Sequence, residues 1–270
     1  MNPDLTILPE TRDLQEPINA SDPVPIADRP EAAEKLPSFC IALPVYNEAA
    51  AIENCIINIA AFLKTVPTRT AIVAVDDGSR DGTWEILLRL QRNLPSLILH
   101  RHVQNGGYGA AQRSLCRLAA ENNFEYALVM DADGTQAPHF ISNFFEPMRR
   151  HVDFVKATRY AKNGSVEGVP WQRYWISRLG NLFAQLVMDL PLTDFSNGFR
   201  AIRTEAWTRI ATTERNFIVL IEEVYLAGKL GLSFAEVPYV LTVRKEAGSE
   251  SKFTYQWGIY WQYLRYVFKR

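Results

Sequence analysis

Apolar runs of strand length alternate with helical patterns along most of the chain, and this alternation limits the fold more than any other feature. Predicted strands cover residues 39–43, 71–75, 97–100, 126–130 and 153–157, and predicted helices cover 49–64, 83–92, 108–121 and 138–149. Strands that alternate with helices form βαβ units, which build a mostly parallel sheet with helices on its faces. We therefore expect an α/β fold with a Rossmann-like, mostly parallel central sheet.

Two of the predicted strands end in pairs of carboxylates. Asp131 and Asp133 follow the fourth predicted strand, and Asp76 and Asp77 follow the second. Ligands of open α/β sheets bind beyond the carboxyl ends of the strands, so we expect both acidic loops to share one site. Such oxygen ligands favour Mg²⁺ or Mn²⁺, although an Asp-x-Asp before a glycine is also compatible with a solvated turn.

The loop after the first predicted strand carries a further acidic side chain. Pro44 stops the strand, and Asn47 and Glu48 place a cap and an acid at the start of the next helix. Capping by Ser79 or Asp81 explains part of the second acidic loop in the same way. Capping does not explain the two carboxylates that lead that second loop.

Four motifs follow one another in a fixed order: Leu43–Glu48, Asp76–Thr83, Asn105–Gly109 and Asp131–Asp133. Together they resemble the family 2 glycosyltransferases of the GT-A fold. Later motifs look like the acceptor side of dolichyl-phosphate mannose synthases and related polyprenyl-phosphate hexosyltransferases, which implies amphipathic acceptor-side helices after the nucleotide-sugar half. These later motifs are Ser177–Asn181, Asp194–Arg200, Val237–Pro238, Arg244 and Gly248–Lys252. The resemblance runs from Ser38 to Lys252.

The resemblance also implies roles for individual residues. A metal ion would be held by Asp131, Asp133 and Gln136, which lies one position later than the family's usual glutamine because Thr135 occupies that place. The residues implied to hold the nucleotide-sugar donor are Pro44, Tyr46, Glu48, Asp76, Asp77, Asn105, Gly106 and Arg244. The residues implied to be catalytic are Asp131, Asp133, Arg178 and Lys252.

A phosphate acceptor suits this set of residues. The donor leaves as a nucleoside diphosphate, whose developing charge a divalent ion stabilises as a Lewis acid. A phosphate acceptor has a second pKa of about 6, so it is largely ionised at neutral pH and needs positive charge rather than a base. Arg178, Arg200, Arg244 and Lys252 supply positive charge in the matching motifs. We therefore predict metal-dependent, inverting transfer of a hexose from a GDP- or UDP-sugar to a polyprenyl phosphate, such as dolichyl or undecaprenyl phosphate.

Two other functions stay open on the sequence. A hydroxyl acceptor in polysaccharide or glycoside synthesis would need a general base, for which Asp194, Glu222 and Glu223 are candidates. A catalytically silent membrane partner that only binds nucleotide sugar is the other alternative. A dinucleotide-dependent oxidoreductase is disfavoured, because Gln112 replaces the last glycine of G-x-G-x-x-G. We expect no nucleic-acid partner.

Length and composition agree with one enzyme domain, expected over residues 38–252. The chain has 270 residues, of which 47% are hydrophobic, and its four histidines lack metal-ligand spacing and receive no role. Residues 1–37 contain eight acids, three bases and seven of the fifteen prolines, so we expect this segment to be disordered. It lacks the basic and apolar regions of a signal peptide, so we expect the catalytic domain in the cytoplasm.

Two aromatic segments indicate a membrane surface. Residues 171–190 carry apolar side chains at a spacing of three to four, which fits either core packing or an amphipathic surface helix. Residues 253–270 are dense in Trp and Tyr and end in basic residues, which suits an amphipathic helix at a headgroup interface. No run approaches the roughly 18 apolar residues that span a membrane. We expect a protein peripheral to the cytoplasmic membrane face, held there by the lipid surface or by a membrane-embedded partner.

Arg244 and Lys252 flank Gly248–Ser249, a stretch that we expect to fold as a lid over the donor and acceptor phosphates. The variant Lys252→Ala should lower kcat of sugar transfer by about tenfold to a hundredfold, the worth of one charge-assisted hydrogen bond. Thermal unfolding should change little, because the residue is expected to act on substrate. Unchanged turnover in a steady-state transfer assay would refute the lid role.

Overall fold

The computed structural model describes residues 35–168, 171–241 and 265–266, all within the unit Ala33–Arg270. The expected disordered segment therefore lies outside the described residues except for its last three positions. Arg244, Lys252 and most of the expected C-terminal helix also lie outside the described residues.

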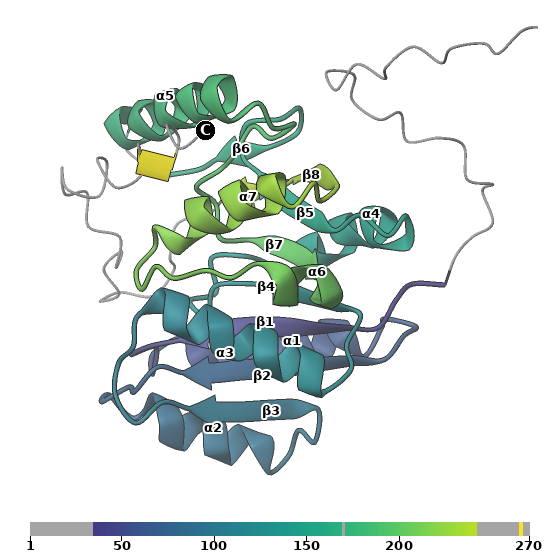
Figure 1. The fold of residues 1–270 in the computed structure, drawn as a ribbon. Coiled ribbons are helices and arrows are strands. Elements are labelled where there is room, and N and C mark those ends of the chain that lie inside the picture. The colour runs from purple at the N-terminus through teal and green to yellow at the C-terminus, as the bar shows by residue number, and fades with distance from the viewer. Residues whose placement is uncertain (1–34, 169–170, 242–264, 267–270) are drawn as a thin grey trace, which may run out of the picture. The chain divides into compact units, whose positions relative to one another are not determined.

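A seven-stranded sheet with the order β3-β2-β1-β4-β7-β5-β8 forms the centre of the described fold (Figure 1). Its strands are β1 (Phe39–Val45), β2 (Thr70–Asp76), β3 (Leu97–Arg101), β4 (Tyr126–Val129), β5 (Phe154–Thr158), β7 (Arg200–Arg203) and β8 (Phe234–Pro238). β1 pairs in parallel with β2 and β4, β2 with β3, and β5 with β8. Within this sheet β7 runs antiparallel, against β4 and β5. The predicted mostly parallel sheet is confirmed.

The antiparallel strand β7 was not predicted from the sequence. Its four residues begin with Arg200 and end with Arg203, so no apolar run marks it. Its neighbours on both sides nevertheless bury Arg200, Ala201 and Ile202 completely. Two further strands, β6 (Ser165–Val166) and β9 (Val240–Leu241), form a separate parallel pair.

The predicted helices are found except near residues 138–149, and two further helices, α6 (Thr204–Arg209) and α7 (Val219–Lys229), were not predicted. The other described helices are α1 (Ile52–Leu63), α2 (Thr83–Gln91), α3 (Tyr108–Glu121), α4 (Phe145–Arg149) and α5 (Trp171–Met188). The single helix predicted over 138–149 is a 3₁₀ helix, η1 (Pro138–Phe144), followed by the short α4. Pro147 explains the break, because proline has no N–H to donate and fits an α-helix only in its first turn.

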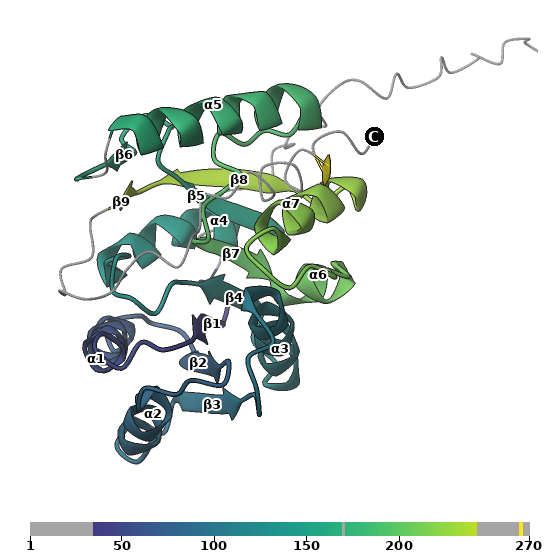
Figure 2. The ribbon, with the colours of Figure 1, turned by 90° about the vertical axis from the view of Figure 1, so that its left-hand side faces the viewer.

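Helices cover both faces of the sheet. On one face lie α1, α2 and α4, and on the other lie α3, α6 and α7 (Figure 2). The first group, with η1, packs side chains such as Ile56 and Phe144 onto the strands, and the second packs Leu115 and Trp207. Alternate residues of β1 enter the two clusters, as expected for a strand buried on both faces. The cores thus lie on either side of a fixed sheet, and the loops at its edges are left to carry function.

A pair of opposite charges is buried under the second face. The Arg200 side chain on β7 is 1% exposed, and its Nε lies 2.5 Å from Glu223 Oε2 on α7. Its other nitrogens donate to Gly198 O at 2.7 Å and Gln112 Oε1 at 3.1 Å. Trp207 Nε1 donates to the second oxygen of Glu223 at 2.8 Å. Loss of either charge would leave the other buried without compensation.

The variant Glu223→Ala should therefore lower the free energy of unfolding by about 3–5 kcal/mol, the cost of breaking a buried pair. The control is Glu121→Ala, which breaks the exposed i,i+4 pair with Arg117 and should cost less than about 1 kcal/mol. Urea denaturation measures both values. Equal losses in the two variants would contradict the assigned importance of the buried pair.

Candidate active site

The acidic loops meet at one edge of the sheet. β1 lies between β2 and β4 and is parallel to both, with Val45 opposite Asp76 and Ala42 opposite Val129. Met130 N donates to Ala42 O at 3.1 Å, so the loop that begins at Asp131 leaves beside the end of β1. Segments far apart in sequence therefore bring their carboxylates to a common edge, as the sequence predicted.

The predicted site residues fall into three groups by position. Those at or near this edge are Pro44, Tyr46, Glu48, Asp76, Asp77, Asn105, Gly106, Asp131, Asp133 and Gln136. Arg178 lies outside these loops, on helix α5. Arg244 and Lys252 lie outside the described residues, so their predicted roles are not tested.

Hydrogen bonds from backbone N–H groups to side-chain oxygens join the loops after β1 and β2. Asn47 N donates to Ser79 Oγ at 2.9 Å, and Asn47 Oδ1 accepts from Arg80 N at 2.9 Å. Glu48 N donates to Thr83 Oγ1 at 2.9 Å. Asn47 was predicted to cap the first helix, but α1 begins at Ile52, and the backbone N–H and side-chain oxygen of Asn47 instead bind the neighbouring loop. These contacts fix the position from which Tyr46 and Glu48 project. Pro44 was predicted to stop the first strand, but β1 continues through it to Val45.

Asp76 ends β2 and is completely buried. Its Oδ1 accepts from Ser79 N at 3.1 Å, and its Oδ2 lies 3.1 Å from Arg101 Nε. In the described part of the chain Oδ2 accepts no hydrogen bond of good geometry. The nearby Arg101 charge compensates this buried carboxylate, and contact between Asp76 and a nucleoside stays a prediction.

Asp77 fastens the loop that follows β3. Its Oδ1 accepts from Gly106 N at 2.9 Å and lies 2.6 Å from His102 Nδ1, and its Oδ2 accepts from Gly107 N at 2.8 Å. His102 Nε2 in turn lies 2.8 Å from Ser114 Oγ on α3. Both oxygens of Asp77 thus bind groups of the protein itself, and these bonds position the glycine loop, Asn105–Gly109. Direct contact between Asp77 and a nucleoside stays a prediction.

His102 belongs to the site but received no role from the sequence, because the spacing of the histidines does not suit metal ligands. The available signal was position: His102 directly follows β3, which is parallel to β2 and therefore ends at the same edge. The same signal had identified the carboxylates after β2 and β4.

Asp131 and Gln136 bind each other twice. Asp131 N donates to Gln136 Oε1 at 2.9 Å, and Gln136 Nε2 donates to Asp131 Oδ2 at 2.8 Å. Asp133 Oδ1 accepts from the N and Oγ1 of Thr135 at 3.0 and 2.7 Å. Gln136 was predicted as a metal ligand, and in the structure it orients Asp131. Metal ligation by its amide oxygen stays a prediction.

Acidic side chains of the first and fourth loops act on the pKa of one buried thiol. Burial raises the pKa of Cys55 on α1 to about 12, and the charges of Asp133, Asp131 and Glu48 act in the same direction. All three carboxylates are therefore close enough to Cys55 to raise its pKa. Two of them, Asp131 and Asp133, form the hard oxygen donor set that Mg²⁺ and Mn²⁺ prefer, so the residues fit such an ion. Among the described residues no group of three His, Cys, Asp or Glu side chains is arranged to hold a metal.

Positive charge gathers after β5, around Tyr160. The guanidinium of Arg159 lies 5.0 Å from the centre of the Tyr160 ring, and that of Arg178 lies 4.9 Å from it. The Tyr160 hydroxyl donates to Ser177 Oγ at 2.7 Å, which ties α5 to this loop. β4 and β5 are both antiparallel to β7, so they point the same way, and this cluster follows a strand that ends at the edge of Asp131. Arg159, like His102, was missed in the sequence.

Buried carboxylates behind this cluster already have partners. Arg159 donates to both oxygens of Asp194, at 2.7 and 2.9 Å. Burial alone would raise the pKa of Asp194, but the Arg159 charge holds it below its usual value. Arg200, which the sequence assigned to an acceptor phosphate, is instead bound to Glu223 in the core, so that assignment is wrong. The sequence motif does not reveal that Arg200 is buried, so its charge was expected to be available to a substrate phosphate.

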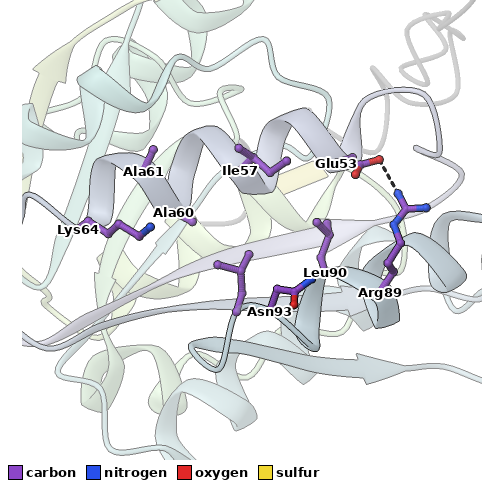
Figure 3. Close-up of a pocket in the computed structure, with 9 residues that line it drawn as sticks. Glu53, Ile57, Ala60, Ala61, Lys64, Arg89, Leu90 and Asn93 are labelled. Atoms are coloured by element: carbon purple, nitrogen blue, oxygen red, sulfur yellow. Dashed lines mark hydrogen bonds and ion pairs between the residues drawn. The ribbon is translucent and has the colours of Figure 1, made fainter.

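A cavity of about 410 Å³ lies elsewhere, between α1 and α2 (Figure 3). Ile57, Leu90 and Leu94 line it, with the ion pair of Glu53 and Arg89 at one end. None of the predicted site residues lines this cavity. The site is therefore defined by the loops at the sheet edge and not by this groove.

Comparison with known proteins identifies the class. The family model for glycosyl transferase family 2 matches residues 40–210. The chain is 29% identical over 233 residues to polyprenol monophosphomannose synthase of Mycolicibacterium smegmatis, covering 81% of this chain and 86% of that protein. It is 30% identical over 214 residues to undecaprenyl-phosphate mannosyltransferase of Micrococcus luteus, covering 78% and 85%. Dolichol-phosphate mannosyltransferase of Pyrococcus furiosus is 29% identical, with 85% of this chain matching 62% of its length.

Solved structures agree on the fold. Glucosyl-3-phosphoglycerate synthase from Mycobacterium tuberculosis, crystallised with Mn²⁺, UDP and glucosyl-3-phosphoglycerate, gives a TM-score of 0.59 at 20% identity over 78% of this chain and 72% of that one. The protein is a glycosyltransferase with the GT-A fold. It belongs to glycosyl transferase family 2. The predicted family, fold class and enzyme class are confirmed.

Proposed function

We propose that this enzyme transfers a hexose, with inversion, from a nucleoside diphosphate sugar to a polyprenyl phosphate, in a reaction that requires Mg²⁺ or Mn²⁺. The observation that carries the proposal is the placement of the acidic loops after β2 and β4 and of the arginine cluster after β5 at the same edge of one sheet. The names of three relatives support it, since each joins mannose to a polyprenyl phosphate. Mannose is accordingly the favoured hexose.

The donor half uses the loops after β2, β3 and β4. Asp131 and Asp133 would hold the metal ion, which when bound neutralises charge on the departing diphosphate. Gln136 keeps Asp131 oriented through two hydrogen bonds. Asp77 keeps Gly106 and Gly107 in place, so that the backbone of this loop can approach the donor closely. Asp76, buried at the end of β2, offers an acceptor to the base or ribose.

The acceptor half uses positive charge. A phosphate monoester is largely ionised at neutral pH because its second pKa is about 6, so attack needs no proton removal. Arg178, beside Tyr160, supplies a guanidinium group whose geometry suits phosphate oxygens. Arg159, on the same ring, is bound to Asp194 and fixes this loop. The task of Arg178 is to hold one acceptor oxygen in line with the anomeric carbon.

Helix α5 supports a membrane-bound acceptor. Its inner side faces the protein, with Ala184 and Asn181 buried and Met188 packed against the second core cluster. Its outer side exposes seven large apolar residues, namely Trp171, Trp175, Ile176, Leu179, Leu182, Phe183 and Leu186, which are between 38% and 75% exposed. Core packing, one interpretation of this stripe, is therefore wrong for these seven residues. A contiguous apolar helix face suits insertion into the headgroup region of a bilayer, where a polyprenyl phosphate resides.

The described helices include none that is long and apolar enough to cross a bilayer. We therefore propose that α5 lies on the membrane surface. The cytoplasmic face expected from the sequence stays a prediction, as does recruitment by a membrane-embedded partner.

Transfer to a short-chain polyprenyl phosphate should be observed with GDP-mannose or a UDP-hexose and should depend on added Mg²⁺ or Mn²⁺. The variant Asp133→Ala should lower this metal-stimulated transfer at least about a hundredfold, because several kcal/mol of leaving-group stabilisation depend on the ion. A radiolabelled-donor assay with a metal titration gives the measurement.

The matched control is Glu121→Ala, an exposed carboxylate at the far end of α3 and outside the loops at the sheet edge. It should retain transfer within about twofold, as a surface substitution does. Metal-stimulated transfer that survives Asp133→Ala would show that the assigned ligand is wrong. Transfer to a sugar hydroxyl but not to the polyprenyl phosphate would reject the proposed acceptor.

The double variant Leu179→Gln/Leu186→Gln should weaken binding to phospholipid vesicles by about tenfold or more, because each leucine transferred into lipid contributes roughly 1.5–3 kcal/mol. Cosedimentation with vesicles containing anionic lipid measures the partition coefficient. The control, Ile57→Gln/Leu88→Gln, changes two exposed apolar residues of α1 and α2 and should bind like the parent. Equal binding by both double variants would exclude α5 as the membrane contact.

A further inference from the structure

The glycine loop of the donor side rests directly on a distant segment, Thr213–Arg215. A Cβ atom at Gly107 would lie 2.3 Å from Arg215 O, and one at Gly109 would lie 2.0 Å from Glu214 O. Gly109 N donates to Arg215 O at 2.9 Å, and Arg215 Nε donates to Gly106 O at 3.2 Å. Two backbones therefore touch without intervening side chains. Any shift of Thr213–Arg215 must move the glycine loop or open this contact.

Glu222 on α7 holds the segment Thr213–Arg215 from the other side. Its side chain is buried and accepts hydrogen bonds from Thr213 N at 3.0 Å, Thr213 Oγ1 at 2.7 Å and Glu214 N at 2.8 Å. The carboxylate thus satisfies two consecutive backbone N–H groups and a hydroxyl. Hydrogen bonds to a charged acceptor are the stronger kind, so this segment is well fixed.

Tyr266 reaches the same carboxylate. Its hydroxyl lies 2.9 Å from Glu214 Oε1 and 3.2 Å from Glu222 Oε1, and its ring centre lies 5.9 Å from that of Tyr225. Figure 2 shows the described segment 265–266, drawn in yellow, beside α7. Burial and the two carboxylates raise the pKa of Tyr266, so its hydroxyl keeps its proton and acts as a donor at neutral pH.

These contacts form one continuous chain. It runs from the Tyr266 hydroxyl through Glu222 to Thr213–Arg215, from there to Gly106–Gly109, and through the amides of Gly106 and Gly107 to Asp77. We propose that Tyr266 and Glu222 are positioning residues for the nucleotide-binding loop Asn105–Gly109. The hydrogen bonds of the Tyr266 hydroxyl to Glu214 and Glu222 then raise the affinity of the enzyme for the nucleoside diphosphate part of its donor. The assignment of this loop to the nucleotide rests on the proposed function.

Tyr266 has two separable contributions. Its ring packs among apolar residues of the second core cluster, which stabilises the fold. Its hydroxyl meets the carboxylates that fix Thr213–Arg215, which positions the loop. The variant Tyr266→Phe removes the second contribution and keeps the first. Glu222→Gln keeps the volume but leaves one acceptor oxygen in place of two, so it should act in the same direction and more strongly.

Two measurements on the full chain test the inference. The first is amide hydrogen exchange of residues 105–109 without nucleotide, which should become at least about threefold faster in Tyr266→Phe while residues 131–137 exchange as in the parent. The second is calorimetric titration with GDP and with UDP, each with Mn²⁺, in which Kd should rise about three- to tenfold, the worth of one hydrogen bond. The control is Tyr225→Phe, which changes the neighbouring ring.

Faster exchange confined to the loop, with weaker nucleotide binding and a normal control, supports the positioning role. Parental exchange in residues 105–109 overturns it, and so does a uniform acceleration along the whole chain, which reports only lower stability. Because exchange is measured without nucleotide, it decides the inference independently of ligand. Failure of the parent to bind either nucleotide would count instead against the proposed function.

Discussion

The parallel pairing of β1 with both β2 and β4 is the constraint on which the site depends. A parallel register sends the chain out of all three strands at the same edge, and the following helices must return across the faces. The acidic residues after these strands are therefore held by the backbone hydrogen bonds of the sheet. Gathering carboxylates at one edge is unfavourable unless positive charge compensates them. Arg101 already lies beside Asp76, and a metal ion is proposed to do the same for Asp131 and Asp133.

The segment 194–200 joins the two halves of the enzyme. Asn197 O accepts a hydrogen bond from the buried Lys156 Nζ, and burial lowers the pKa of this lysine to about 8. A Cβ at Gly198 would lie 3.2 Å from the Tyr108 hydroxyl and 3.5 Å from Asp131 Oδ1. The glycine thus lets the segment 194–200 lie against Asp131, a proposed metal ligand. Because the two are in close contact, a displacement of Gly198 must displace Asp131, and the reverse.

The sequence was sufficient for the features that depend on local pattern. Asp76 and Asp131 could be placed because each follows an apolar run of strand length, and the helix over Trp171–Met188 could be placed from its apolar spacing. What could not be predicted depends on partners distant in sequence. The short strand β7 has no apolar pattern and exists because β4 and β5 flank it. Likewise the burial of Arg200 depends on Glu223, which is 23 residues away.

The described carboxylates also bear on the choice of acceptor. A general base must direct a lone pair at the proton it removes. Asp194 accepts from two nitrogens of Arg159, and Glu223 accepts from Arg200 and Trp207. The oxygens of Glu222 likewise accept hydrogen bonds from the backbone N–H groups of Thr213 and Glu214. To act on a hydroxyl acceptor, each would have to break buried charge-assisted bonds. An ionised phosphate demands no such rearrangement, so the internal hydrogen bonding of these three residues favours a phosphate over a hydroxyl as the nucleophile.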